Sequence, residues 1–217
     1  MTDGKVQWHP GFNQAFQIEL GEELAKVHIE TEHLLGKKPM QIDTLVITKE
    51  KGTKIHKNIG RIFRRYNILE YKSPDDHISI NDFYKVYGYA CFFVSDTEKV
   101  GEIDPQELTI TFACYKYPRK MLAHIRKLRG ITVEKYGDGI YYLLGDPFPM
   151  QLLVIRKLSK KDNYWLQILR NDLQSGGEIQ ELIERYEPVK NQPRFQALMD
   201  VLTQANRKEV EEKNLCK

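Results

Sequence analysis

The sequence predicts an α/β protein in which helices flank a mixed central sheet. Two observations predict this class. Segments whose apolar residues alternate, as in strands, are interleaved with segments whose apolar residues recur every three or four positions, as in helices. Glycine and proline stand at the ends of several segments, where they punctuate secondary structure. We expect a core over residues 1–130 and, over residues 131–217, a smaller β-hairpin and helical extension.

The predicted core opens with a helix and three strands. Phe12, Phe16 and Leu20 recur at helical spacing. An alternating strand and a β-branched-rich strand follow, joined by a Gly-Lys-Lys-Pro connection that suits a hairpin. A basic segment then suits a short helix that leads into the third strand. In order, these elements are predicted over residues 11–25, 27–35, 40–48, 59–66 and 67–72.

A second helix follows Ser79, which forms a capping-box pattern with Asp82 three positions later. Apolar and tyrosine side chains at helical spacing form its buried stripe. A proline at its start and a glycine at its end delimit the last helix of the core. The predicted ranges are 80–96 for the second helix, 108–115 for the strand after it and 118–130 for the last helix.

The C-terminal extension begins with a Gly-Asp-Gly turn between two short strands. A further strand and three helical segments follow, and the last helix ends in a charged tail. In order, the further strand and the helices are predicted over residues 149–158, 163–173, 178–187 and 193–213.

Composition and cysteine usage predict a cytoplasmic protein without a membrane partner. Apolar residues make up 41% and charged residues 29% of the 217 residues, as in ordinary globular proteins. Cys91, Cys114 and Cys216 have no metal-type spacing, and their odd number indicates reduced thiols. No signal-peptide pattern and no apolar run of membrane length is present. The sequence is compatible with a homodimer and does not require one.

Four polar residues break the apolar pattern of the elements that contain them. Asp43 lies in the middle of the β-branched-rich strand. Glu70 and Lys72 share one face of the third strand, because strand side chains alternate. Glu19 lies on the face of the first helix that should pack. Burying an acid is costly unless it is paired or metal-bound, and sites where several local rules fail together are candidate functional sites.

Metal-assisted hydrolysis of phosphodiesters uses this combination of residues. Mg²⁺ takes carboxylate and carbonyl oxygens as ligands and keeps several waters. Asp43 and Glu70 would hold the ion, with Glu19 and the backbone carbonyl of Tyr71 as further ligands, and Mn²⁺ would substitute for Mg²⁺. Lys72 would lie beside the metal, where its charge activates a water or stabilises the transition state.

The sequence resembles the PD-(D/E)XK nuclease superfamily, whose members share a restriction-endonuclease-like core. It is most similar to a bacterial branch that is often labelled transposase-like. The segments that carry the resemblance are IELGEEL, KKPMQIDTLVITK, IGRIFRRYNILEYKSP and NDFYKVYGYAC, within residues 9–115. The resemblance implies a metal-dependent nuclease that acts on DNA, linked to a mobile element or to DNA recombination.

The resemblance carries over residue by residue. Asp43 matches the motif aspartate, and Glu70 and Lys72 match the (D/E)XK pair. Glu19 matches the glutamate of the first helix. Ile42 stands where the name-giving pattern has proline, which makes the motif less specific without changing its chemistry.

Two basic blocks without acidic residues, over residues 51–69 and 108–133, predict contacts with DNA phosphates. The net charge of the whole chain is only +3, so these blocks concentrate the positive charge. The residues predicted to bind nucleic acid are Lys54, Lys57, Arg61, Arg64, Arg65, Arg119 and Lys120.

Two other functions fit the same residues. A nuclease-fold protein could bind nucleic acid without cutting it, and in that case Glu70 and Lys72 form an ion pair only. A protein–protein interaction module would use the C-terminal helices as its working surface. The sequence leaves open whether the substrate is DNA or RNA and whether it is single- or double-stranded.

Overall fold

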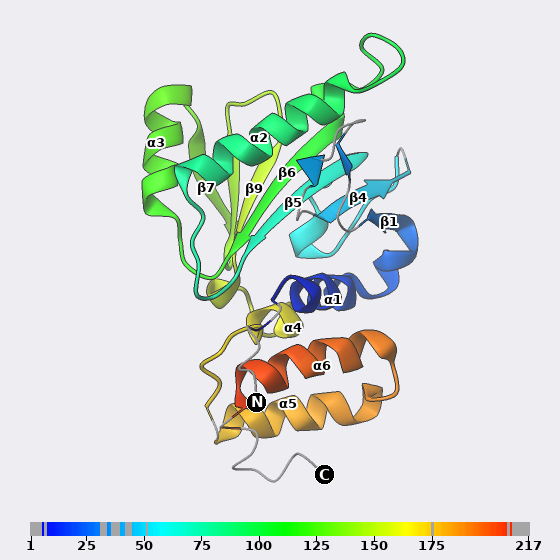
Figure 1. Cartoon of the computed structure of the whole chain (residues 1–217), viewed down its shortest axis with the longest axis vertical. Helices are drawn as coiled ribbons and strands as arrows, with labels where there is room; N and C mark the ends of the chain where they lie inside the picture. The colour runs from blue at the N-terminus through cyan, green and yellow to red at the C-terminus, as the bar shows by residue number, and fades with distance from the viewer. Residues whose placement is uncertain are drawn as a thin grey trace.

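A seven-stranded mixed sheet forms the centre of the computed structural model (Figure 1). The strand order is β1-β4-β5-β6-β9-β8-β7. In that order the strands are Val27–Glu30, Leu45–Lys49, Tyr66–Lys72, Leu108–Cys114, Met150–Val154, Ile140–Leu144 and Thr132–Gly137. A second sheet pairs β2 (Leu34–Leu35) with β3 (Met40–Gln41). The structure describes residues 6, 8–30, 34–35, 40–41, 45–50, 52–174, 176–207 and 209.

The central strands β5, β6 and β9 run parallel, and the outer strands run antiparallel to their neighbours. Lys72 pairs with Cys114, and Cys114 pairs with Val154, so the three parallel strands end at the same level. We call this the carboxyl end of the sheet. The opposite end, where Tyr66 pairs with Leu108, is the amino end. In open α/β sheets, ligands bind outside the carboxyl ends of the strands.

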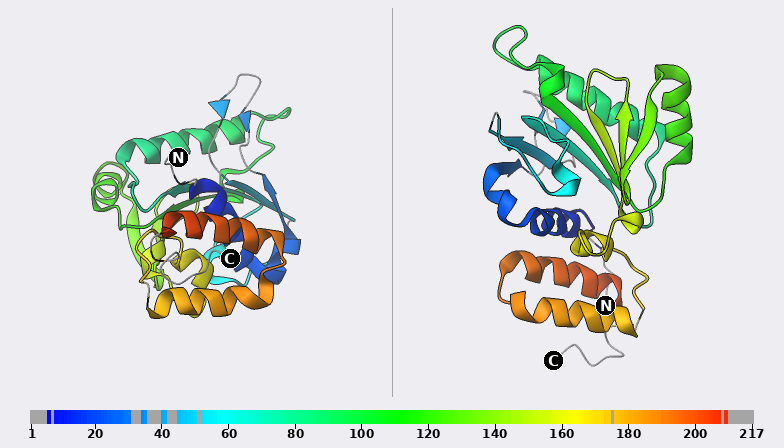
Figure 2. Two further views of the ribbon diagram at one scale, coloured as in Figure 1. Left: turned by 60° about the horizontal axis from the view of Figure 1, so that its bottom comes forward. Right: turned by 180° about the vertical axis from the view of Figure 1, so that it is seen from behind.

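Helices cover both faces of the sheet (Figures 1 and 2). Two of them, α2 and α3, lie on one face, and α1 lies on the other. Beyond α1 lie α4, α5 and α6, with α5 and α6 side by side (Figure 2). The helices are α1 Trp8–Leu20, α2 Ile80–Ser95, α3 Arg119–Arg129, α4 Tyr164–Gln167, α5 Gly177–Tyr186 and α6 Pro193–Ala205. Within the described ranges, no helix has both the length and the apolar character that a membrane span requires. The predicted α/β class is confirmed.

Alternating side chains of β5 separate two hydrophobic cores. Leu69 and Tyr71 belong to the core beneath α1, where Tyr71 stacks on Phe12 with ring centroids 4.1 Å apart. Ile68 belongs to the core between the sheet and α2, together with Phe83. A residue of β5 therefore faces either α1 or α2.

The capping box predicted at the start of α2 is present. The Asp82 N–H donates to Ser79 Oγ at 3.2 Å, and the Ser79 N–H donates to Asp82 Oδ2 at 2.8 Å. These bonds satisfy two donors that would otherwise lack partners at the start of the helix. The cap begins α2 shortly after the chain leaves β5 at Lys72.

The β-hairpin of β7 and β8 belongs to the central sheet, which corrects our expectation of a hairpin outside the core. All five residues of β9 are buried, and this strand pairs with β6 on one side and β8 on the other. A strand that is buried along its whole length has neighbours on both sides and a core on both faces. The sheet therefore extends past residue 130, as far as Val154.

The short helix predicted over residues 59–66 does not form. Only a 3₁₀ turn over Asn58–Gly60 is present, and β5 begins at Tyr66. The Arg64 N–H donates to Asn67 Oδ1 at 2.9 Å and to Thr109 Oγ1 at 3.2 Å instead of to a helical carbonyl. Tertiary hydrogen bonds therefore hold this segment as a loop.

Several other elements are shorter than predicted. The strand ranges 27–35 and 40–48 are described as β1 with β2 and as β3 with β4, and residues 31–33 and 42–44 lie outside the described residues. In place of a helix over 163–173 only α4 forms, because Asn206 binds the backbone beyond it, accepting from the Leu173 N–H at 3.0 Å.

Gly139, in the turn between β7 and β8, should tolerate no side chain. Its φ is +72°, and an added Cβ would lie 2.6 Å from Leu158 N and 2.8 Å from Val154 O. Because backbone strain and overlap add, we expect Gly139→Ala to destabilise the fold by about 3–4 kcal/mol. Gly130→Ala is the matched control, since its φ is +66° but nothing lies within 4 Å of the added atom. It should cost about 1 kcal/mol in urea unfolding, and equal losses for the two variants would contradict the role of close packing.

Candidate active site

Glu70 and Lys72 lie on the α2 face of the sheet, at the carboxyl end of β5. Glu70 is only 2% exposed. Lys72 Nζ lies 3.5 Å from Glu70 Oε1 and 2.8 Å from Asp82 Oδ1 of α2. The pair predicted from the sequence therefore shares one face of the strand. Together with Asp82 it forms a group of one ammonium and two carboxylates, which we call the Lys72 cluster.

Asp82 joins this cluster to the start of α2. Its Oδ1 binds Lys72, while its Oδ2 accepts from the Ser79 N–H at 2.8 Å and from the Ser79 hydroxyl at 2.6 Å. Sequence reasoning identified Asp82 only as a capping residue. The signal for its second role is the short connection over residues 73–79, which starts a capped helix close to the end of β5.

The charges of the cluster fix the protonation of Lys72. Burial lowers the pKa of Lys72, but the hydrogen bond to Asp82 and the charge of Glu70 outweigh it, so the pKa is raised. Burial also opposes ionisation of Asp82, yet the hydrogen bonds from Lys72 and Ser79 lower its pKa. Lys72 therefore keeps its proton at neutral pH. It is suited to stabilise negative charge and poorly suited to act as a general base.

Glu19 lies apart from the Lys72 cluster. It is buried on α1, which covers the other face of the sheet. Its Oε1 accepts from the backbone N–H groups of Trp165 at 2.6 Å and Leu166 at 3.3 Å, and its Oε2 accepts from Lys57 Nζ at 2.9 Å. Glu19 therefore caps the first turn of α4. Glu19 is therefore not part of the shared metal site predicted from the sequence, because three donors already bind its carboxylate.

The other two predicted ligands are placed differently. Asp43 lies outside the described residues; the chain is described again from Leu45, which pairs with Leu69, the residue before Glu70. Tyr71, expected to contribute its backbone carbonyl, directs its ring away from Glu70 into the core beneath α1. Across the described ranges, no three His, Cys, Asp or Glu side chains gather as a metal site would require.

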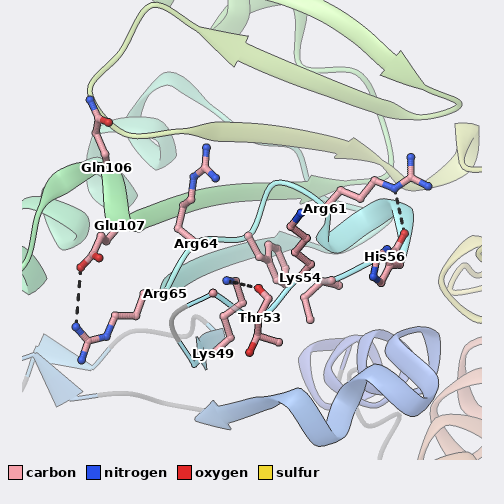
Figure 3. Close-up of a pocket in the computed structure, with 12 residues that line it drawn as sticks. Lys49, Thr53, Lys54, His56, Arg61, Arg64, Arg65, Gln106 and Glu107 are labelled. Atoms are coloured by element: carbon pink, nitrogen blue, oxygen red, sulfur yellow. Dashed lines mark hydrogen bonds and ion pairs between the residues drawn. The ribbon is translucent and has the colours of Figure 1, made fainter.

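Much of the first basic block lines one groove at the amino end of the sheet (Figure 3). We call it the basic groove. Four of the predicted nucleic-acid-binding residues line it, and Lys49, which sequence reasoning missed, lines it too. The four are Lys54, Arg61, Arg64 and Arg65. Arg65 precedes Glu70 by five residues, which corresponds to roughly 16 Å along a strand.

The remaining predicted cations lie elsewhere. Lys57 belongs to the same block as the groove residues but pairs with Glu19. Arg119 and Lys120 are exposed in the first turn of α3, directly after β6. Since β6 ends level with Lys72, Arg119 and Lys120 follow the carboxyl end of the sheet. The structure therefore places these two residues and the basic groove at opposite ends of the sheet.

No protein-family model, no curated protein and no solved structure matches this chain. Function must therefore be inferred from the residues and their geometry.

We expect Lys57 to stabilise the fold. Lys57→Met would leave the buried carboxylate of Glu19 without its cation, at a cost of about 2–3 kcal/mol at pH 7. Burial raises the pKa of Glu19, which the bonds from Lys57, Trp165 and Leu166 only partly offset. Folding therefore penalises the ionised form, and this penalty disappears once the side chain is protonated. The destabilisation should shrink as the pH falls toward 4.5, the ordinary value for glutamate.

Urea unfolding at several pH values measures this effect. Lys54→Met is the matched control, because Lys54 lines the basic groove and its ammonium has no hydrogen bond or ion pair within the described part of the chain. It should leave stability unchanged across the pH range. Equal destabilisation by both substitutions would show that the Glu19 contact contributes nothing.

Proposed function

We propose that this protein is a metal-dependent nuclease that hydrolyses phosphodiester bonds in DNA, with a restriction-endonuclease-like core. The observation that carries the proposal is the placement of Glu70 and Lys72. They lie 3.5 Å apart on one face of β5, at the end of three parallel strands where α/β sheets bind ligands. The resemblance of the motifs to PD-(D/E)XK nucleases supports the same function.

In this proposal Asp43 and Glu70 bind Mg²⁺, and Mn²⁺ substitutes for it. Glu70 offers the hard oxygen ligand that Mg²⁺ prefers. When bound, the ion would supply positive charge and help to orient the attacking water. The second carboxylate has to come from Asp43, because Asp82 is already bound by Lys72 and Ser79.

Lys72 stabilises the negative charge that develops on the phosphate. Its raised pKa keeps it protonated, and its 2.8 Å contact with Asp82 fixes its position before the substrate arrives. A charge positioned in advance requires no reorganisation during the reaction. Asp82 is thus a positioning residue. Arg119 and Lys120, at the same end of the sheet, would contact the phosphates of the DNA. A link to a mobile element or to recombination rests on the resemblance alone.

A nucleic-acid-binding protein that does not cut is the second candidate, favoured by a basic groove that lies away from Glu70. A protein–protein interaction module has weaker support. Its expected surface is the C-terminal helices, and their apolar residues Ile179, Leu182, Leu198 and Leu202 are already buried in the core that contains α1.

Replacing Glu70 and replacing Lys72 should affect Mg²⁺ affinity and cleavage differently. Glu70→Gln keeps the shape of the side chain but removes a charged metal ligand, so both Mg²⁺ affinity and cleavage should fall. Lys72→Met should leave Mg²⁺ affinity nearly intact and lower the cleavage rate by about two to three orders of magnitude. Cleavage of single-stranded DNA, duplex DNA and RNA, calorimetric Mg²⁺ affinity and melting temperature measure these effects. Full activity of folded Lys72→Met protein would defeat the catalytic role.

Asp82→Asn tests the positioning role. The substitution removes the charge that raises the pKa of Lys72, so the loss of activity at alkaline pH should begin at a lower pH than in the wild type. The cleavage rate at neutral pH should fall about tenfold, the effect of roughly 1.4 kcal/mol. Ser79→Ala is the control, since it removes the helix cap but leaves the contact between Asp82 and Lys72. An alkaline shift of the same size in Ser79→Ala would mean that Asp82 acts only through the stability of α2.

A further inference from the structure

The basic groove (Figure 3) lies at the amino end of the sheet, whereas the Lys72 cluster lies at its carboxyl end. It has a volume of about 480 Å³. Its walls come from the end of β4, the loop that follows it, the segment before β5 and the turn before β6. The charged side chains that line it are Lys49, Lys54, Arg61, Arg64, Arg65 and Glu107.

Three of the groove cations have partners within the protein, and two of these partners are backbone carbonyls. The contacts are Lys49 Nζ to Thr53 O at 2.7 Å, Arg61 Nε to His56 O at 3.0 Å and Arg65 Nη1 to Glu107 Oε2 at 3.9 Å. Glu107 is the single carboxylate among the described lining residues, so one negative charge faces five positive ones. A groove with this imbalance attracts anions.

Arg64 and Lys54 are available to a ligand. No carboxylate or carbonyl of the described chain accepts a hydrogen bond from the guanidinium of Arg64 or the ammonium of Lys54. Burial and the nearby charge of Arg64 lower the pKa of Lys49, as expected where like charges gather without counterions. A bound anion would relieve this repulsion.

An exposed aromatic ring borders the groove next to Arg61. Arg61 Nη1 donates to the hydroxyl of Tyr136 at 3.4 Å. Tyr136 stacks on Tyr142, with ring centroids 4.4 Å apart and an interplanar angle of 17°, yet Tyr136 is 47% exposed. Cations that follow a backbone, combined with an aromatic ring open to a base, form the surface on which proteins bind unpaired nucleic acid.

We propose that the basic groove and Tyr136 together bind an unpaired strand of nucleic acid, with phosphates on Arg64 and Lys54 and a base stacked on Tyr136. A duplex would offer phosphates to the groove, but its bases are stacked on one another and would leave Tyr136 unused. The site lies roughly 16 Å from Glu70 along β5. Binding there goes beyond the proposed nuclease activity and does not depend on it.

Fluorescence anisotropy of the full chain, without divalent metal, measures this binding. The probes are a labelled thymidine homopolymer, a labelled uridine homopolymer and a labelled DNA duplex. We expect the wild type to bind the single strands at least about tenfold more tightly than the duplex, because stacking adds to the phosphate contacts. Replacing both Arg64 and Lys54 by alanine should weaken binding at least about tenfold. It should also reduce the slope of log affinity against log salt by about 1.4, since two phosphate contacts are lost.

Replacing Tyr136 separates stacking from charge. Tyr136→Ala should weaken single-strand binding about tenfold without changing the salt slope or the affinity for the duplex. Tyr136→Trp keeps a ring, so this variant should retain binding, and the added indole fluorescence should be quenched by the strand. Lys190→Ala, which removes an exposed charge from the connection between α5 and α6, outside both basic blocks, is the control and should bind as the wild type does.

Three results would overturn the inference. One is tight duplex binding that falls equally with single-strand binding in every groove variant, which would indicate a duplex backbone site. The second is unchanged affinity in Tyr136→Ala together with unquenched Tyr136→Trp. The third is an equal loss in Lys190→Ala, which would indicate attraction by net charge. Cleavage assays report separately on Glu70 and Lys72, so this site and the nuclease activity can fail independently.

Discussion

Strand β5 sends successive side chains to opposite faces of the sheet, and this alternation decides which residues can share a site. Leu69 and Tyr71 pack beneath α1, while Ile68, Glu70 and Lys72 face α2. An acid on α2 therefore reaches Lys72, whereas an acid on α1 is separated from it by the sheet. The helix that covers each face of the sheet therefore determines which residues can contact Glu70 and Lys72.

The two buried acids Glu19 and Glu70 offset the cost of burying a carboxylate in different ways. Glu19 is surrounded by donors, since two backbone N–H groups and one ammonium bind its two oxygens. Such a carboxylate has little capacity left for a ligand, which suits a structural role. Glu70 shares its nearby cation with Asp82, so the Lys72 cluster has one ammonium for two carboxylates.

Elements with a local signal could be predicted from the sequence. The capping box at Ser79 and Asp82 and the proline and glycine around α3 act over a few residues, so the starts and ends of these helices follow from nearby side chains. Likewise the shared face of Glu70 and Lys72 follows from strand periodicity alone. The helix predicted over residues 59–66 does not form, because the amide of Arg64 donates to Asn67 and Thr109. The periodicity of apolar residues does not indicate such partners.

The arrangement of the charged groups depends on topology, which the sequence pattern does not contain. Glu19 is bonded to amides that lie 146 and 147 residues further along the chain. The two basic blocks look alike in the sequence, yet the cations of the basic groove precede β5, whereas Arg119 and Lys120 follow β6. Because β5 and β6 run parallel, these positions fall at opposite ends of the sheet. The partners of Glu19 and the placement of the basic residues therefore follow only from the order and direction of the strands and helices.

The contact of Glu19 with the start of α4 also constrains how the chain folds during synthesis. α1 leaves the ribosome well before the amides of Trp165 and Leu166 that bind Glu19, because these amides lie 146 and 147 residues further along the chain. Until then α1 lacks both its contact with α4 and the helix α6 that covers it. Closing a loop of this length costs entropy before any contact repays it, and contacts of high sequence separation slow folding. α1 is therefore synthesised well before it can reach its final environment.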